Sequence, residues 1–80
     1  MIVKLRLYNY SDVKEFVDIA NRIDSIIYLE DGNGLRVNAK SVLGALYTME
    51  YNNIYCVCAD DISNKIFRFI EGTMSCWKEK

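Results

Sequence analysis

Hydrophobic and polar residues alternate along the first residues of the chain and then change to a helical period. The segment IVKLRLY alternates apolar residues with polar or amphipathic ones, which is typical of a strand with one buried face. From Ser11 to Ile23 the apolar residues recur at steps of three or four, which predicts an amphipathic helix. Asn9 or Ser11 is placed to cap that helix. Its apolar stripe consists of Val13, Phe16, Val17, Ala20 and Ile23.

A glycine-rich turn separates two further alternating segments. Between residues 26 and 39, apolar residues alternate on both sides of the sequence DGNG, which is the usual pattern of a β-hairpin. Calcium-binding loops can begin in this way, but DGNG lacks the third acidic ligand and the terminal bidentate glutamate, so a turn is the better interpretation. The alternating apolar residues are Ile27, Leu29, Leu35, Val37 and Ala39.

The second half of the chain predicts a short helix, a strand and a last helix. The short helix runs from Ser41 to about Tyr51, and the segment NIYCVCA predicts a strand that carries its two cysteines on one face. Asp60 or Asp61 then opens the last helix, since aspartate is a favoured cap. This helix is expected to bury Ile62, Ile66, Phe67, Ile70, Met74 and Trp77.

The predicted order of elements is therefore βαββαβα. Strands that are polar on one face and helices with one apolar stripe each predict an α+β fold, a two-layer open-faced sandwich in which three helices cover one face of a four-stranded antiparallel sheet. The sequence has no proline, linker, low-complexity tract or internal repeat, so residues 1–80 are expected to form a single domain.

Charge and hydropathy narrow the range of partners. Ten basic residues against eleven acidic ones give a net charge of −1, which does not favour binding to nucleic acid. The amino terminus reaches a charged residue within four positions, and no apolar run approaches the roughly 20 residues that span a membrane. We therefore expect a cytoplasmic protein with no nucleic acid and no membrane among its partners.

Residues suited to catalysis are scarce. Histidine, the commonest general base near neutral pH, does not occur in the sequence. Asp60 and Asp61 stand at a predicted helix start, where adjacent acids are typical caps. The three cysteines, Cys56, Cys58 and Cys76, lack the number and spacing of zinc ligands and are expected to be reduced thiols. The sequence thus predicts a protein that is not an enzyme and has no metal and no cofactor.

Ser41 stands where the predicted third strand gives way to a helix. Serine is a favoured N-cap, and the free backbone N–H groups and the positive end of the helix dipole lie beside it. Capping alone explains a serine at this position, while phosphorylation of its hydroxyl is the alternative role.

The sequence VNAKSVLG, preceded by SIIYLEDGNGLR, resembles the strand-turn-strand-serine-helix segment of HPr, the phosphocarrier protein family of the bacterial phosphotransferase system. The predicted βαββαβα order is similar over the whole chain. In HPr proteins a histidine at the start of the first helix carries the phosphoryl group, an arginine two residues on assists it, and a proline follows. These positions fall on Asn9, Ser11 and Asp12. The resemblance therefore implies a chain that does not transfer phosphate by the family route.

The resemblance keeps a second HPr feature, the serine at the start of the second helix that HPr kinase phosphorylates in many Gram-positive bacteria. This serine maps onto Ser41. The catabolite-repression HPr homologue also lacks the histidine, keeps the serine and regulates through a transcription-factor partner. The resemblance implies a bacterial, non-catalytic protein-binding module, a monomer or weak homodimer, with Ser41 as a regulatory phosphorylation site. Its docking residues would be Val42, Leu43 and Leu46.

Two alternatives from other classes stay open. A small ferredoxin-like regulatory domain that binds a metabolite between subunits would suit a chain of this size, although the trailing helix after the fourth strand argues against it. An enzyme that uses Cys76 is the other, although no local motif points to an activated thiol.

Overall fold

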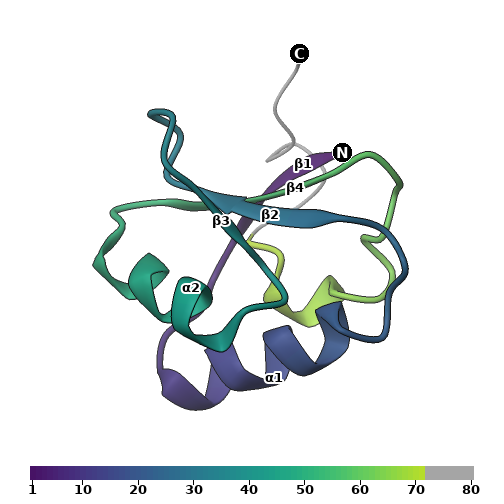
Figure 1. The fold of residues 1–80 in the computed structure, drawn as a ribbon, viewed down its shortest axis with the longest axis horizontal. Helices are drawn as coiled ribbons and strands as arrows, with labels where there is room; N and C mark the ends of the chain where they lie inside the picture. Colours follow the sequence, from purple (N-terminus) through teal and green to yellow (C-terminus); the bar gives the residue numbers. More distant parts are fainter. Residues whose placement is uncertain (72–80) are drawn as a thin grey trace.

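The structure, a computed structural model, describes residues 1–71 of the 80-residue chain (Figure 1). The described part is an α+β fold with four strands and two α-helices in the order βαββαβ, and two short 3-10 helices, η1 and η2. The strands are β1 (Ile2–Leu5), β2 (Ile27–Glu30), β3 (Arg36–Asn38) and β4 (Ile54–Cys58). The helices are α1 (Tyr10–Ala20), α2 (Val42–Tyr47), η1 (Thr48–Glu50) and η2 (Phe67–Phe69).

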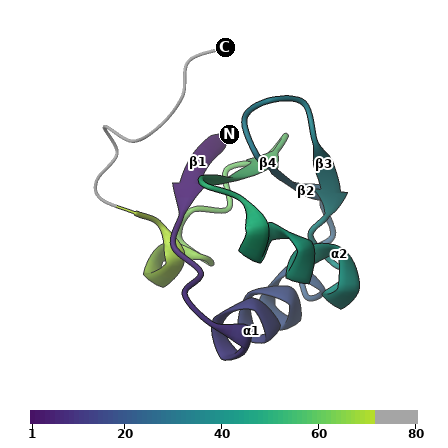
Figure 2. The same cartoon turned by 90° about the vertical axis from the view of Figure 1, so that its left-hand side faces the viewer.

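The four strands form one antiparallel sheet in the order β1-β4-β2-β3. Its register aligns Val3 with Cys56, Cys56 with Leu29, and Leu29 with Val37, so one apolar row crosses the whole sheet. Successive side chains of a strand point to opposite faces, which puts the polar neighbours of this row on the other side. Both α1 and α2 lie against one face of the sheet, as Figures 1 and 2 show together. The sheet is therefore covered by helices on the face that carries the apolar row.

Helix α1 is capped at its amino end by the side chain of Asn9. The Asn9 side chain accepts a hydrogen bond from the backbone N–H of Asp12 at 2.9 Å, and the Asp12 carboxylate accepts one from the N–H of Tyr8 at 3.0 Å. These two bonds resemble a capping box, and the first satisfies an N–H group that a helix start leaves free. Of the two caps that the sequence offered, Asn9 is thus the one used, and Ser11 lies inside the helix.

The core fills the space between the sheet and α1. Phe16 is fully buried and packs edge-to-face against Phe69, with ring centroids 5.6 Å apart. Cys56 lies in the same core, and burial raises the pKa of its thiol from 9.0 to about 12. The predicted stripe of α1 is buried as expected, although Ile23 lies beyond the end of the helix. The buried residues of α1 are Val13, Phe16, Val17 and Ala20.

The predicted last helix is wrong for residues 60–71. The Asp61 carboxylate accepts hydrogen bonds from the backbone N–H and the hydroxyl of Ser63, which forms a local turn instead of a helix start. After η2 the chain then pairs with the open edge of β1. The backbone N–H of Arg6 donates to Phe69 O at 2.7 Å, and Glu71 N–H donates to Lys4 O at 2.9 Å. This pairing satisfies edge groups that a helix would leave unpaired.

Apolar burial in this last segment follows the prediction in part. Ile62, Ile66 and Ile70 are buried as expected, whereas Phe67 is 75% exposed and Phe69 occupies the core instead. Met74 and Trp77, which the predicted helix was expected to bury, lie outside the described residues. Within residues 1–71 two α-helices, and not three, cover the sheet.

Candidate docking surface on helix α2

Ser41 caps α2 as the sequence predicts. Its backbone is extended, with φ −100° and ψ 121°, and its hydroxyl oxygen accepts a hydrogen bond from the N–H of Gly44 at 3.1 Å. Its carbonyl oxygen accepts from the N–H of Ala45 at 2.8 Å, which closes the first helical turn. Ser41 is exposed, so the hydroxyl that caps the helix is also open to solvent.

The start of α2 is fixed against the end of α1. The side-chain amide of Asn21 donates to both Val17 O and Lys40 O, and the Lys40 ammonium donates to Ile23 O. These bonds tie the residue before the cap to the segment where α1 ends. The residue before Ser41 is therefore held against the end of α1 by side-chain hydrogen bonds to the backbone.

Most of α2 faces solvent. Ala45 is its buried residue, and Thr48 in η1 is buried with its hydroxyl donating to Ala45 O. In contrast, Leu43 is 75% exposed and Tyr47 is 69% exposed, one helical turn further on. We call the resulting surface the α2 patch, which consists of Val42, Leu43, Leu46 and Tyr47.

The predicted docking residues differ from one another in exposure. Leu43 and Val42 are exposed, whereas Leu46 is partly buried and packs against the core. Tyr47 was not among the residues predicted from the sequence. Its position four residues after Leu43 could have indicated it, because residues at that spacing share one helical face.

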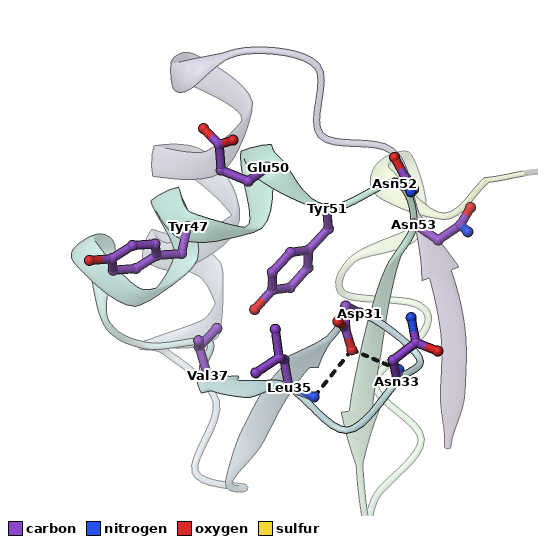
Figure 3. A pocket seen from close by; sticks show the side chains of 9 residues that line it. All are labelled: Asp31, Asn33, Leu35, Val37, Tyr47, Glu50, Tyr51, Asn52 and Asn53. Atoms are coloured by element: carbon purple, nitrogen blue, oxygen red, sulfur yellow. Dashed lines mark hydrogen bonds between the residues drawn. The ribbon is translucent and has the colours of Figure 1, made fainter.

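A hollow of about 580 Å³ lies beside the α2 patch, between η1 and the β2–β3 turn. Figure 3 shows the Tyr51 ring at its centre with Leu35 and Val37 beside it, and the ring of Tyr47 at the outer edge. Asp31 lies below the Tyr51 ring, while the Glu50 carboxylate points away from that ring at the rim of the hollow. Three asparagines complete the lining. We call this site the Tyr51 hollow.

The Tyr51 hollow is lined by acidic groups without a base. Among the described residues that line it, Asp31 and Glu50 are carboxylates and none is Lys or Arg. Asp31 Oδ1 accepts from the backbone N–H of Asn33 at 2.7 Å and of Leu35 at 3.2 Å. Neither bond uses Oδ2. Burial, and then the charge of Asp31, raise the pKa of the Tyr51 hydroxyl, so the tyrosine is neutral and Asp31 is the charge that it faces.

The β2–β3 turn that forms one wall of the hollow depends on glycine. Gly32 and Gly34 have φ values of 87° and 108°, which side chains rarely tolerate. The turn leaves Leu35 outside β3 and 61% exposed, so its place in the predicted strand is not the observed one. Leu35 instead becomes an apolar wall of the Tyr51 hollow.

The other candidate residues do not form a second site. Asn9 and Asp12 are engaged in capping α1, and Ser11 lies exposed on its first turn. Cys56 and Cys58 are buried and free, while Cys76 lies outside the described residues. Within residues 1–71 no three His, Cys, Asp or Glu side chains gather as a metal site would require. In the same range, no helix has the length and apolar character needed to cross a membrane.

Comparisons with known proteins give no match, whether with protein-family models, with curated proteins or with solved structures. The HPr resemblance therefore stays a prediction from the quoted residues. What the described residues define is an α+β protein with an exposed apolar helix surface beside an acidic and aromatic hollow.

Proposed function

We propose that this protein is an HPr-like binding module without phosphocarrier chemistry, which docks onto a protein partner through the α2 patch and is switched by phosphorylation of Ser41. The observation that carries the proposal is the exposure of Leu43 two residues after Ser41, the exposed N-cap of the same helix. Exposed apolar side chains that lie side by side, as Leu43 and Tyr47 do one helical turn apart, mark a surface where a partner can bind.

Phosphorylation would change the surface without rebuilding the fold. A phosphate on Ser41 adds a charge of about −1.5 to −2 next to Val42 and Leu43. Partners that bury the uncharged patch would then meet an anion at its edge, whereas partners with Arg or Lys at that place would gain charge-assisted hydrogen bonds. The same patch could thus select different partners in the two states.

The partners that the proposal implies are proteins. HPr kinase would modify Ser41, and a transcription regulator would read the modified surface, in a bacterial cytoplasm. The proposal includes no enzyme activity, cofactor, nucleic acid or membrane, and it takes the protein as a monomer or weak homodimer.

Docking is tested with two matched charge substitutions. Leu43→Glu places a carboxylate on the α2 patch, and Phe67→Glu places one on η2, at a residue with the same 75% exposure. Partners are captured from a lysate of the source organism on wild type and on each variant, and are identified and measured again with purified protein. We expect the partner to survive Phe67→Glu and to be lost on Leu43→Glu. Equal capture by all three proteins would refute docking through the α2 patch.

The switch is tested separately with purified HPr kinase and ATP. Intact-mass measurement should show one added phosphoryl group on wild type and none on Ser41→Ala. A true HPr serves as the positive control for the kinase. If HPr is modified while this protein is not, the switch is refuted, and docking alone would remain.

The ferredoxin-like alternative keeps one supporting observation. The Tyr51 hollow has a volume of about 580 Å³, which lies in the range of small-molecule sites. A rise in melting temperature with amino acids or nucleotides, absent in a Tyr51→Ala variant, would favour a metabolite-binding regulatory domain over a docking module.

A further inference from the structure

We infer that the Tyr51 hollow receives a lysine or arginine side chain of the protein that docks on the α2 patch. The inference rests on the proposed docking function and adds the chemistry of the partner. The partner segment would be apolar where it covers Leu43 and Leu46, and basic where it passes Glu50 at the rim and enters the hollow beside Asp31.

Charge is the first argument. The hollow carries Asp31 and Glu50 and no base among its described lining residues. Three other acids in residues 1–71 do stand beside bases: Arg36 pairs with Glu30, Arg68 pairs with Glu15, and Lys4 lies 3.7 Å from Glu71. Asp31 uses Oδ1 for the turn and leaves Oδ2 uninvolved in those bonds, and Glu50 makes no hydrogen bond or ion pair within the described residues. A cation from outside would complete this site.

The ring of Tyr51 is the second argument. Arginine and lysine cations are attracted to the faces of tyrosine rings, and the attraction is strengthened by a nearby carboxylate. This protein uses the same arrangement internally, because the Arg36 guanidinium lies 4.5 Å from the centroid of Tyr28 while it pairs with Glu30. The Tyr51 ring and Asp31 offer a similar ring and acid without an internal guanidinium.

The walls of the hollow suit the rest of such a side chain. Lysine and arginine carry aliphatic stems that bury well against apolar surface while the charged end stays with polar partners. Leu35 and Val37 supply that surface beside Tyr51. Leu35 is 61% exposed outside β3, so contributing to the core does not explain a leucine at this position.

The hollow and the α2 patch form one continuous surface. A smaller hollow of about 440 Å³ is lined by Leu43, Leu46, Tyr47 and Glu50, and the last two also line the Tyr51 hollow. Leu43 and Glu50 are seven residues apart, a span of about 10 Å along a helix. A short partner segment can therefore place apolar side chains on the patch and one basic side chain in the hollow.

The test uses the full chain and two labelled helical peptides, followed by fluorescence anisotropy. Both peptides carry leucines at helical spacing; one has a lysine at each end and the other has glutamate there, so orientation does not matter. The inference expects the wild type to bind the lysine peptide about tenfold more tightly than the glutamate peptide. Asp31→Asn with Glu50→Gln should remove most of that difference. The asparagine keeps the oxygen that accepts the turn hydrogen bonds.

The matched control is Asp18→Asn with Asp24→Asn, which removes the same charge from two exposed acids outside the hollow. This control should change the affinity for the lysine peptide by less than about twofold. An equal loss in both double variants would show only a general charge effect and would overturn the inference. Failure of the wild type to bind the lysine peptide would overturn it as well.

Two further outcomes separate this inference from the proposed function. If both peptides bind the wild type equally and Leu43→Glu weakens both, docking on the α2 patch stands and the cation site is refuted. Butylammonium alone is titrated while the tyrosine resonances are observed by NMR. If it shifts Tyr51 while the lysine peptide binds no better than the glutamate peptide, the hollow takes a small cation, and the inference of a partner side chain is overturned.

Discussion

Helices α1 and α2 both carry apolar side chains, but the two helices use them differently. In α1 the apolar stripe is buried against the sheet, and Phe16 alone contacts a second large ring in the core. In α2 the residue fully buried is Ala45, while Leu43 and Tyr47 remain largely in water. Folding therefore explains the apolar stripe of α1 and Ala45 of α2, whereas it does not explain Leu43 and Tyr47.

The caps of the two helices differ in the same direction. Asn9 caps α1 together with Asp12, whose carboxylate accepts a hydrogen bond from the backbone N–H of Tyr8. Ser41 caps α2 through one side-chain bond, to Gly44 N–H. A change at Ser41 therefore affects one bond of a six-residue helix, while α1 keeps its position on the core. This difference makes the start of α2 suited to a modification that leaves the fold intact.

The largest expected effect compares truncations on the two helices. Phe16→Ala should cost about 3–5 kcal/mol of the free energy of unfolding, because it leaves a cavity beside Phe69. Leu43→Ala should change it by no more than about 0.5 kcal/mol, since that side chain is 75% exposed. A domain of this size is stabilised by about 4–12 kcal/mol, so Phe16→Ala leaves little margin. Urea unfolding followed by circular dichroism measures both variants.

A large loss on Leu43→Ala would break the comparison, because it would show that the α2 patch also stabilises the fold. In that case the docking experiments with Leu43→Glu would report on unfolding. Thermal melting of Leu43→Glu and Phe67→Glu beside wild type is therefore the matching control.

The next effect is the pH dependence of stability that the buried Cys56 thiol causes. Burial raises the pKa of Cys56 from 9.0 to about 12, so between these values the unfolded chain has lost the thiol proton and the folded chain has kept it. Stability should therefore fall as the pH rises through this window, by about 1.4 kcal/mol per pH unit from this thiol. Melting temperatures between about pH 9 and pH 11 measure the slope.

The matched variant for this slope is Cys56→Ala. The raised pKa of Tyr51 acts in the same direction and is retained in the variant, so the slope should become smaller without vanishing. An unchanged slope in Cys56→Ala would show that the thiol is more accessible than its position in the core implies.

Much of the fold could be predicted from local patterns, and the exceptions have a common cause. The stripe of α1, the alternation of β4 and the cap at Ser41 each depend on residues close in sequence, and all three are observed. The helix predicted after β4 is not observed, although Ile62, Ile66 and Ile70 stand at helical spacing. The chain forms backbone hydrogen bonds with the open edge of β1 instead. No local pattern reveals that competition, because the partner strand lies more than sixty residues earlier.

Of the candidate site, only the part that lies within one local segment was anticipated from the sequence. Ser41 was singled out by its place at a helix start and Leu43 by the resemblance to HPr, and both roles stay predictions. The Tyr51 hollow was not found, because Asp31, Leu35 and Tyr51 come from separate segments that only the folded chain brings together. The turn at Gly32 decides which way Leu35 points, and a sequence pattern that alternates across the turn does not contain that information.

The smallest expected effect tests why α2 contains a glycine. Gly44 lies inside the helix, where glycine costs about 1 kcal/mol relative to alanine. A Cβ at this position would lie 3.4 Å from Val37 Cβ, from Asn38 O and from Ser41 Oγ, which is close to ordinary contact. Gly44→Ala should therefore raise the free energy of unfolding, by about 0.5 kcal/mol after some of the gain is lost to crowding. Urea unfolding measures the change. A loss of stability would show instead that the glycine serves the close approach of α2 to β3, and α2 would then resemble α1 in being shaped by packing.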